Sequence, residues 1–193
     1  MTPLRLAILG STRGSNLLGL IEAISQKKLA ATIELVLSDK PQAMILERAR
    51  AHHIPAFFVD PSGLSREAFD EKLSEKIASY SIELIVLIGY MRILSKPFVT
   101  QWQHQIINVH PSLLPAYANA MDKAVHQAVL NDEQTETGCT VHFVTEAVDA
   151  GPILVQKKCP VFKEDTVDTL KARVQQLEVG ALIDAILMVR QRG

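Results

Sequence analysis

The sequence predicts a single α/β domain built on a doubly wound, mostly parallel β-sheet, with a C-terminal hairpin and a long final helix. Strand-like and helix-like segments alternate through the first half of the chain. The segment 84–89 is almost purely aliphatic, which is typical of a parallel strand with both faces covered. A length of 193 residues with 48% hydrophobic content supplies one sizeable core and is short for two.

The first half is expected to alternate strands with helices. The expected strands cover residues 4–10, 33–38, 56–59 and 84–89, and the expected helices cover about 15–28, 43–53 and 65–80. Ser65 is the candidate N-cap of the third helix, because a serine hydroxyl accepts a backbone N–H bond at that position. This β-α-β-α order predicts parallel strands joined by right-handed crossovers.

The pattern changes in the second half. Its expected strands cover residues 105–109, 139–145 and 152–161, with a helix at about 122–130 after a proline-rich loop. A long amphipathic helix begins at Asp165, and its core-facing residues are Leu170, Val174, Leu177 and Ala181. No repeat or linker interrupts the chain, so residues 1–193 are expected to form one domain.

The composition argues against several classes of protein. A formal net charge of −1 without a basic tail argues against binding nucleic acid by bulk electrostatics. No apolar run reaches the length of a membrane span, and the N-terminus lacks a secretory signal pattern. Cys139 and Cys159 could lie opposite each other if residues 139–145 and 153–159 pair as a hairpin, but a disulfide is disfavoured, and they are interpreted as reduced thiols of a cytoplasmic protein without a zinc site.

The segment 107–115 carries the most informative residues. Asn108 and His110 stand two apart at the end of an expected strand, so their side chains point the same way. An amide donor beside an imidazole suits acyl-group chemistry, in which an oxyanion develops and a proton moves at neutral pH. No motif for a covalent nucleophile is present, which favours direct transfer to an incoming substrate.

Two further segments follow expected strands, where α/β sheets bind ligands. The loop 10–16 contains Gly14, Ser15 and Asn16 at the start of a helix, and phosphate binding is favoured there over a plain turn with a side-chain cap. In the segment 89–94, Arg92 is equally suited to clamp a carboxylate or to solvate a helix start.

Asp149 lies in the connection between the last two expected strands, where aspartate commonly serves a turn. It gains importance if it reaches His110, because a carboxylate stabilises the protonated imidazole. Among the other histidines, His142 is interpreted as a satisfied sheet residue, and His104 and His126 have no polar constellation around them in the sequence.

Five motifs give the chain a resemblance to the phosphoribosylglycinamide formyltransferases, a family of folate-dependent enzymes with a Rossmann-like fold. They cover residues 14–17, 89–94, 108–115, 138–144 and 148–152, and the resemblance extends over essentially the whole chain. It implies transfer of a formyl group from 10-formyltetrahydrofolate, as co-substrate and without a metal, to the amine of glycinamide ribonucleotide in purine biosynthesis.

The resemblance also implies roles for individual residues. Asn108, His110 and Asp149 match the catalytic trio. The residues matching the ribonucleotide site are Gly14, Ser15, Asn16, Gln175 and Glu178, and those matching the folate site are Arg66, Met91, Arg92, Ile93, Leu94 and Thr145. We therefore expect a phosphate-binding half at 1–104 and a catalytic and folate-binding half at 105–193. The protein is expected to be a monomer or homodimer that binds neither nucleic acid nor membrane.

The chain departs from the family after Pro115. Asn119 stands where the family commonly has Gly, and Met121 stands where it commonly has His. Asn tolerates left-handed backbone, so the turn is expected to survive. The missing imidazole leaves the contribution of this loop to substrate binding open, with Lys123 as a candidate to compensate.

Alternative functions remain open at this point. A formyltetrahydrofolate hydrolase or a methionyl-tRNA formyltransferase uses related chemistry, but each is expected to carry an additional domain. A nucleotide-binding or oxidoreductase module would use the first loop, with Asp39 holding a ribose, and would leave Asn108, His110 and Asp149 unexplained. The changes at 117–123 also allow a catalytically inactive relative.

Overall fold

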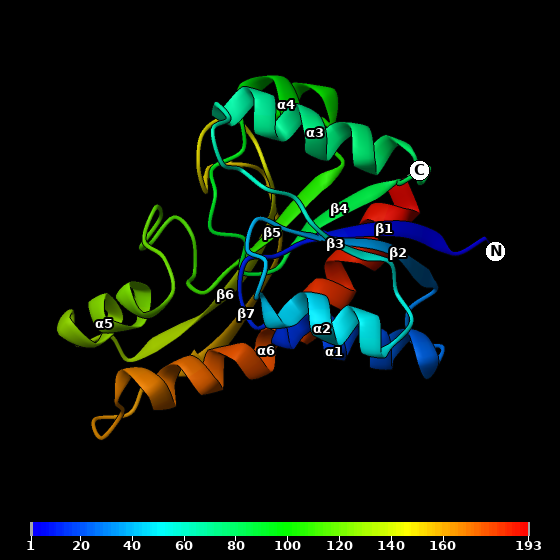
Figure 1. The fold of residues 1–193 in the computed structure, drawn as a ribbon. Helices are drawn as coiled ribbons and strands as arrows, with labels where there is room; N and C mark the ends of the chain where they lie inside the picture. Colours follow the sequence, from blue (N-terminus) through cyan, green and yellow to red (C-terminus); the bar gives the residue numbers. More distant parts are fainter. Residues whose placement is uncertain (1, 193) are drawn as a thin grey trace. The chain divides into compact units, whose positions relative to one another are not determined.

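The computed structural model describes residues 2–192 and has the expected α/β arrangement (Figure 1). The strands are β1 (Leu4–Leu9), β2 (Ala31–Ser38), β3 (Ala56–Phe58), β4 (Leu84–Leu87), β5 (Ile106–His110), β6 (Glu136–Phe143) and β7 (Ile153–Pro160). The helices are α1 (Ser15–Ser25), α2 (Met44–Ala51), α3 (Arg66–Ala78), α4 (Lys96–Gln101), α5 (Lys123–Asn131) and α6 (Val167–Arg192).

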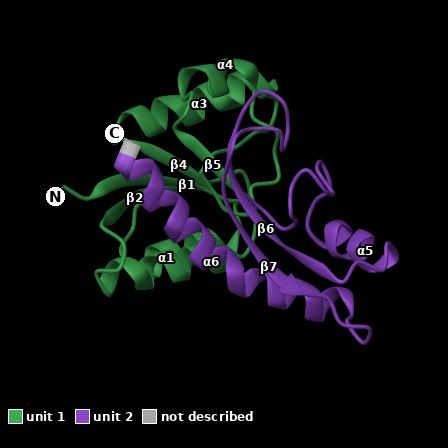
Figure 2. Cartoon of the chain, turned by 180° about the vertical axis from the view of Figure 1, so that it is seen from behind, with its two compact units in different colours: residues 1–108 green, residues 109–193 purple. Residues whose placement is uncertain are grey.

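The strands hydrogen-bond in the order β3-β2-β1-β4-β5-β6-β7. The pairs β1–β2, β1–β4, β2–β3 and β4–β5 are parallel, whereas β6 and β7 are antiparallel. The chain therefore has the predicted mostly parallel sheet, with a hairpin and a long helix near its C-terminus. It divides into two compact units, residues 1–108 and 109–193 (Figure 2).

The first unit is doubly wound. After β1 the chain steps outward to β2 and β3, and it then returns to the other side of β1 for β4 and β5. Helices α1 and α2 cover one face of these strands, and α3 and α4 lie on the other (Figure 1). Every residue of β4 is buried, which confirms the interpretation of its aliphatic sequence as a strand covered on both faces.

Several element boundaries differ from expectation for local reasons. Helix α1 ends at Ser25 rather than near 28, because Lys27 adopts a left-handed φ of 58° that stops the helix. Helix α4 was not predicted, since its six residues, which begin at Lys96 with a proline near the start, are too few to show a helical period. The predicted cap of α3 is confirmed, as the Ser65 hydroxyl accepts the Ala68 N–H at 3.1 Å.

In the second unit, α6 packs against β6, β7 and α5. Leu170, Val174 and Ala181 are fully buried as expected, but Leu177 is only half-buried and its neighbour Glu178 is the buried residue on that turn. Within residues 2–192, none of the helices combines the length and apolarity that crossing a bilayer requires.

The hairpin register corrects the expectation for the two cysteines. Cys139 pairs with Lys157, and Cys159 pairs with Thr137, so the cysteines are not opposite each other. Both are free and buried thiols. Register depends on the exact length of the connection and on a bulge between Val141 and His142, neither of which the strand pattern reveals.

Candidate active site

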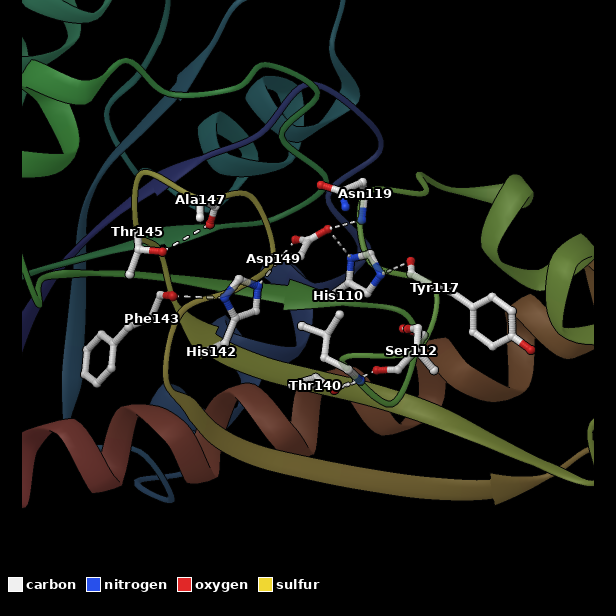
Figure 3. A network of polar contacts seen from close by, with 12 residues as sticks. His110, Ser112, Tyr117, Asn119, Thr140, His142, Phe143, Thr145, Ala147 and Asp149 are labelled. Carbon is white, nitrogen blue, oxygen red and sulfur yellow. Dashed lines mark hydrogen bonds and ion pairs between the residues drawn. The ribbon is translucent and has the colours of Figure 1, made fainter.

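His110 lies at the end of β5 with 4% of its surface exposed, and both of its ring nitrogens face oxygen atoms (Figure 3). Nε2 is 3.1 Å from the Tyr117 carbonyl oxygen, and Nδ1 is 3.4 Å from Oδ2 of Asp149. A carbonyl and a carboxylate can only accept hydrogen bonds, so both contacts are satisfied together only by the doubly protonated ring.

Burial opposes that protonation. It is the largest influence on His110 and lowers the pKa of the ring below its usual 6.5, and the nearby His142 acts in the same direction. The charge of Asp149 and the Tyr117 carbonyl raise the pKa but do not cancel the effect of burial. His110 is therefore held close to two proton acceptors in surroundings that favour its neutral form.

Asp149 reaches His110, which was the condition set for its importance. Its Oδ2 also accepts the Asn119 N–H at 2.9 Å, while Oδ1 lies 3.6 Å from Nε2 of His142. Burial raises the pKa of the carboxyl, but the contacts with His142, Asn119 and His110 outweigh burial and leave the pKa below its usual range. The side chain is a carboxylate at neutral pH.

His142 is the residue that sequence reasoning missed. It lies in β6 with 2% of its surface exposed, and its Nδ1 is 2.9 Å from the Phe143 carbonyl oxygen. It is a buried sheet residue, as interpreted from the alternation of the strand, but it also contacts Asp149. Its position one residue before the end of β6, beside the connection that carries Asp149, is the signal that could have identified it.

Asn108 occupies the same strand as His110, two residues earlier, and is half-buried. Because alternate side chains of a strand point to the same side, the amide and the imidazole share a face of β5. The structure thus keeps the strand geometry from which the pairing of these two residues was predicted.

A buried polar network fixes the loop that follows His110 (Figure 3). The Thr140 hydroxyl donates to the Ser112 carbonyl at 2.6 Å and accepts the Leu114 N–H at 3.0 Å. Gln156 donates its side-chain amide to the Leu114 carbonyl and to the Thr140 hydroxyl, each at 2.9 Å. The β6–β7 hairpin therefore holds residues 112–114, just beyond the imidazole.

The loop 117–122 explains how the chain accommodates its departures from the family. Tyr117, Asn119 and Asp122 all have left-handed φ angles, of 59°, 65° and 47°. Asn119 thus keeps the backbone conformation expected of a family glycine. Met121 is 47% exposed. Lys123, the candidate to compensate for the missing imidazole, forms an ion pair with Asp168 at 2.7 Å.

In the first unit, the loop after β1 turns sharply at Gly14, the N-cap of α1. Gly14 has a φ of +66°, and a Cβ there would lie 2.4 Å from Cγ1 of Ile45, so no other residue fits without rearrangement. The N-cap position of α1 is occupied by Gly14, so neither Ser15 nor Asn16 is the N-cap residue. Ser15 is exposed and Asn16 is buried.

The segment after β4 is tied to that loop through Ser11. The Ser11 N–H donates to the Gly89 carbonyl at 3.1 Å, and the Ser11 hydroxyl accepts the Met91 N–H at 2.9 Å. The same hydroxyl donates to Oδ1 of Asp39 at 2.6 Å. Asp39 is 3% exposed and already engaged in this bond, which weakens the alternative in which it holds a ribose.

The remaining candidates for the folate site lie on both units. Met91 and Ile93 are exposed, and Leu94 is buried. The guanidinium of Arg92 stacks 4.5 Å above the Phe69 ring, and Arg66 is exposed at the start of α3. In the second unit, the Thr145 hydroxyl donates to the Ala147 carbonyl at 3.1 Å (Figure 3).

The remaining candidates for the ribonucleotide site lie on α6. Gln175 is half-buried, and Glu178 is 8% exposed close to the Cys139 thiol, whose pKa burial raises to about 12. Across the described part of the chain, no group of three or more His, Cys, Asp or Glu side chains could hold a metal ion.

Comparison with known proteins gives one consistent result. The model of a family described as formyl transferase matches residues 4–186. The phosphoribosylglycinamide formyltransferase of Escherichia coli (strain K12) is 40% identical over 176 residues, 91% of this chain and 82% of that protein. The enzyme of the same name from Bacillus subtilis (strain 168) is 35% identical, with 98% of this chain and 97% of that protein covered.

Larger relatives and solved structures agree. Trifunctional purine biosynthetic proteins adenosine-3 match at 39% identity in Drosophila melanogaster and 40% in Bos taurus, and the chain spans only 14% and 18% of their lengths. The crystal structure of glycinamide ribonucleotide transformylase 1 from Symbiobacterium toebii superposes with a TM-score of 0.93 at 36% identity, covering 98% of this chain and 89% of that one.

Proposed function

Since this chain belongs to the formyl transferase family, we propose that it transfers the formyl group of 10-formyltetrahydrofolate to the amine of glycinamide ribonucleotide, a step of purine biosynthesis. The observation that carries the proposal is the contact between His110 and Asp149, with Asn108 on the same strand. These three side chains supply the donors and the carboxylate that the reaction needs.

The proposed reaction is a direct transfer. The substrate amine bonds to the formyl carbon, the bond from that carbon to N10 of the folate then breaks, and one proton passes from the amine to N10. The Asn108 amide and a protonated His110 donate to the oxyanion of the tetrahedral intermediate, where such donors act most strongly. The formyl oxygen takes the place of the Tyr117 carbonyl as acceptor of the Nε2 proton.

Asp149 has two tasks in this scheme. Its negative charge stabilises the protonated form of His110, against the effect of burial. Its carboxylate also accepts and passes on the amine proton through water. Both tasks require an ionised side chain, and the low pKa of Asp149 supports that state.

The substrate sites follow from the matched residues. We assign the ribonucleotide phosphate to the loop at Gly14, Ser15 and Asn16, where the turn and the start of α1 favour an anion. Gln175 and Glu178 are assigned to the sugar, because a carboxylate suits hydroxyl donors. The proposed folate contacts are Arg66, Met91, Arg92, Ile93, Leu94 and Thr145.

We also propose how the chain works as a protein. Residues 1–193 act as one formyltransferase domain, with a phosphate-binding half at 1–104 and a catalytic half at 105–193. The assigned folate residues at 66 and 91–94 fall in the first half, so folate binding is not confined to the second. The enzyme acts on small molecules in the cytoplasm as a monomer or homodimer, and sedimentation of the purified protein measures which.

The test is a turnover assay with purified protein, glycinamide ribonucleotide and 10-formyltetrahydrofolate, following release of tetrahydrofolate. Release that requires the ribonucleotide supports formyl transfer. Release without it indicates a hydrolase, and binding without release indicates an inactive relative. Absence of turnover by well-folded protein refutes the proposed activity.

The roles of Asn108 and His110 are tested in the same assay. Asn108→Ala and His110→Ala should each lower turnover by at least about a hundredfold, the scale for lost oxyanion donors and acid–base groups. Asn131→Ala and His52→Ala, which change exposed residues at the ends of α5 and α2, are matched controls. Near-normal turnover of His110→Ala removes the role assigned to it.

A further inference from the structure

His142 makes a contact to which the proposed trio assigns no task. In Figure 3 the Asp149 carboxylate lies between two imidazole rings, with His110 on one side and His142 on the other. Oδ2 faces Nδ1 of His110 at 3.4 Å, and Oδ1 faces Nε2 of His142 at 3.6 Å. The two oxygens of the carboxylate are thus divided between the two rings.

The residues next to Asp149 do not hold its side chain by burial, although the Thr145 hydroxyl and the Ala150 N–H both donate to the Ala147 carbonyl and fix the turn. Residues 146–148 and Ala150 are exposed, so the connection is not fixed by burial on either side of Asp149. Asp149 itself has a left-handed φ of 53°, an uncommon conformation for a residue with a side chain. The carboxylate must therefore be oriented by what its oxygens contact.

Apart from His110 itself, His142 is the contact that lies in regular secondary structure. It lies within β6, is 2% exposed, and has its Nδ1 fixed by the Phe143 carbonyl at 2.9 Å. Asn119, which also donates to Asp149, belongs to an exposed loop with several left-handed residues. The ring of His142 is thus held in place and can fix the position of Oδ1.

We propose that His142 is a positioning residue that holds the Asp149 carboxylate with Oδ2 turned toward His110. Its Nδ1 donates to the Phe143 carbonyl, and its Nε2, which must also carry a proton because a carboxylate only accepts, meets Oδ1. Without this contact the carboxylate is free to rotate away, and His110 loses the charge that favours its protonated form. This inference rests on the proposed formyl transfer and adds a fourth residue to it.

The test separates the two ring nitrogens of His142. In His142→Gln the side-chain amide reaches the Nε2 position and can donate to Asp149. In His142→Asn the amide reaches only the Nδ1 position and can donate to Phe143. We expect His142→Asn to lower kcat by about tenfold to a hundredfold with little change in KM, the range for groups that orient the side chains of an active site. His142→Gln should retain most of kcat.

A double-mutant cycle provides the second measurement. In an Asp149→Ala background, His142→Asn should cause no further loss of kcat, because the carboxylate that it positions is gone. His52→Asn, at an exposed site after α2, is the control for the substitution itself. Equal activity of the Asn and Gln variants, additive losses in the cycle, or a change in KM alone each overturns the inference.

These outcomes are distinct from a failure of the proposed function. If the unaltered protein does not transfer formyl groups, the proposed function fails. If it does and the His142 variants keep full kcat, only the role of His142 fails. Should His142→Asn be too unstable to assay, a crystal structure of His142→Gln decides: Asp149 turned away from His110 overturns the inference, and Asp149 in place supports it.

Discussion

At the scale of single residues, the site is defined by opposing influences on one imidazole. His110 faces acceptors through both nitrogens, which favours two ring protons, while burial lowers its pKa. The charge of Asp149 is the main influence that raises this pKa, and the formyl oxyanion supplies a further negative charge only during the reaction. A ring that is protonated most readily when the transition state forms suits a donor to that oxyanion.

This balance predicts the response of His110 to loss of its partner. Asp149→Asn removes the negative charge that raises the pKa of His110, so the pKa should fall further below 6.5. The measurement is an NMR titration of the His110 ring resonances in the free protein. Asp60→Asn, which alters an exposed carboxylate bonded to Ser62, should leave the titration unchanged. A pKa that stays constant or rises in Asp149→Asn contradicts the assignment.

At the scale of elements, local patterns predicted most of the fold. The alternating strands and helices of the first unit were predicted from aliphatic runs and punctuation, and the cap at Ser65 was predicted from residue type. The hairpin register and the contact of His142 with Asp149 could not be predicted. The register depends on a bulge, and the contact joins residues from different segments of the chain. The periodicity of a strand reveals neither feature.

Helix α5 shows the same limit at His126, for which the sequence offered no polar constellation. The structure buries this residue to 1% exposure, beside an ion pair between Asp122 and Lys171 that links α5 to α6. Its Nδ1 has no hydrogen-bond partner within the described residues. Burial, as the largest influence, lowers the pKa of His126 from 6.5 to about 4.

The buried His126 should make the fold sensitive to acid. As pH falls from about 6.5 to 4, the unfolded chain binds a proton at this histidine and the folded chain does not. The free energy of unfolding therefore falls over that window, by about 3 kcal/mol at most. His126→Phe should reduce this loss, which urea unfolding at pH 7 and pH 4.5 measures. His52→Phe, at an exposed position, should leave the acid sensitivity unchanged. If His126→Phe loses as much stability in acid as the unaltered protein, the buried ring of His126 is not neutral.

At the scale of the molecule, topology explains where the ligand loops arise. In the first unit the strand order reverses at β1, so the loops after β1 and β4 leave neighbouring strands. Ligands of α/β sheets bind at such reversal points. The alternation of strands and helices was enough to predict that the loops after these strands lie together and bind ligands. It could not reveal that Ser11 bonds the two loops together, because that bond joins residues 80 positions apart.

The phosphate assignment makes a prediction for the stability of the whole protein. A ligand that binds only the folded state at a hundredfold excess over its Kd adds about 2.7 kcal/mol, which corresponds to roughly 5–10 °C in Tm. Glycinamide ribonucleotide should raise Tm by that amount. Ser15→Asp should abolish the rise at the same concentration, because it places a negative charge in the loop assigned to the phosphate.

The ligand-free Tm of Ser15→Asp should stay close to that of the unaltered protein, since Ser15 is exposed and an acid is favourable in the first turn of a helix. Ser65→Asp is the matched control, because it adds the same charge at the exposed start of α3, where Asp also caps well. Its response to the ribonucleotide should be normal. A full rise in Tm for Ser15→Asp would place the phosphate elsewhere, whereas a selective loss ties the anion to the turn that Gly14 makes possible.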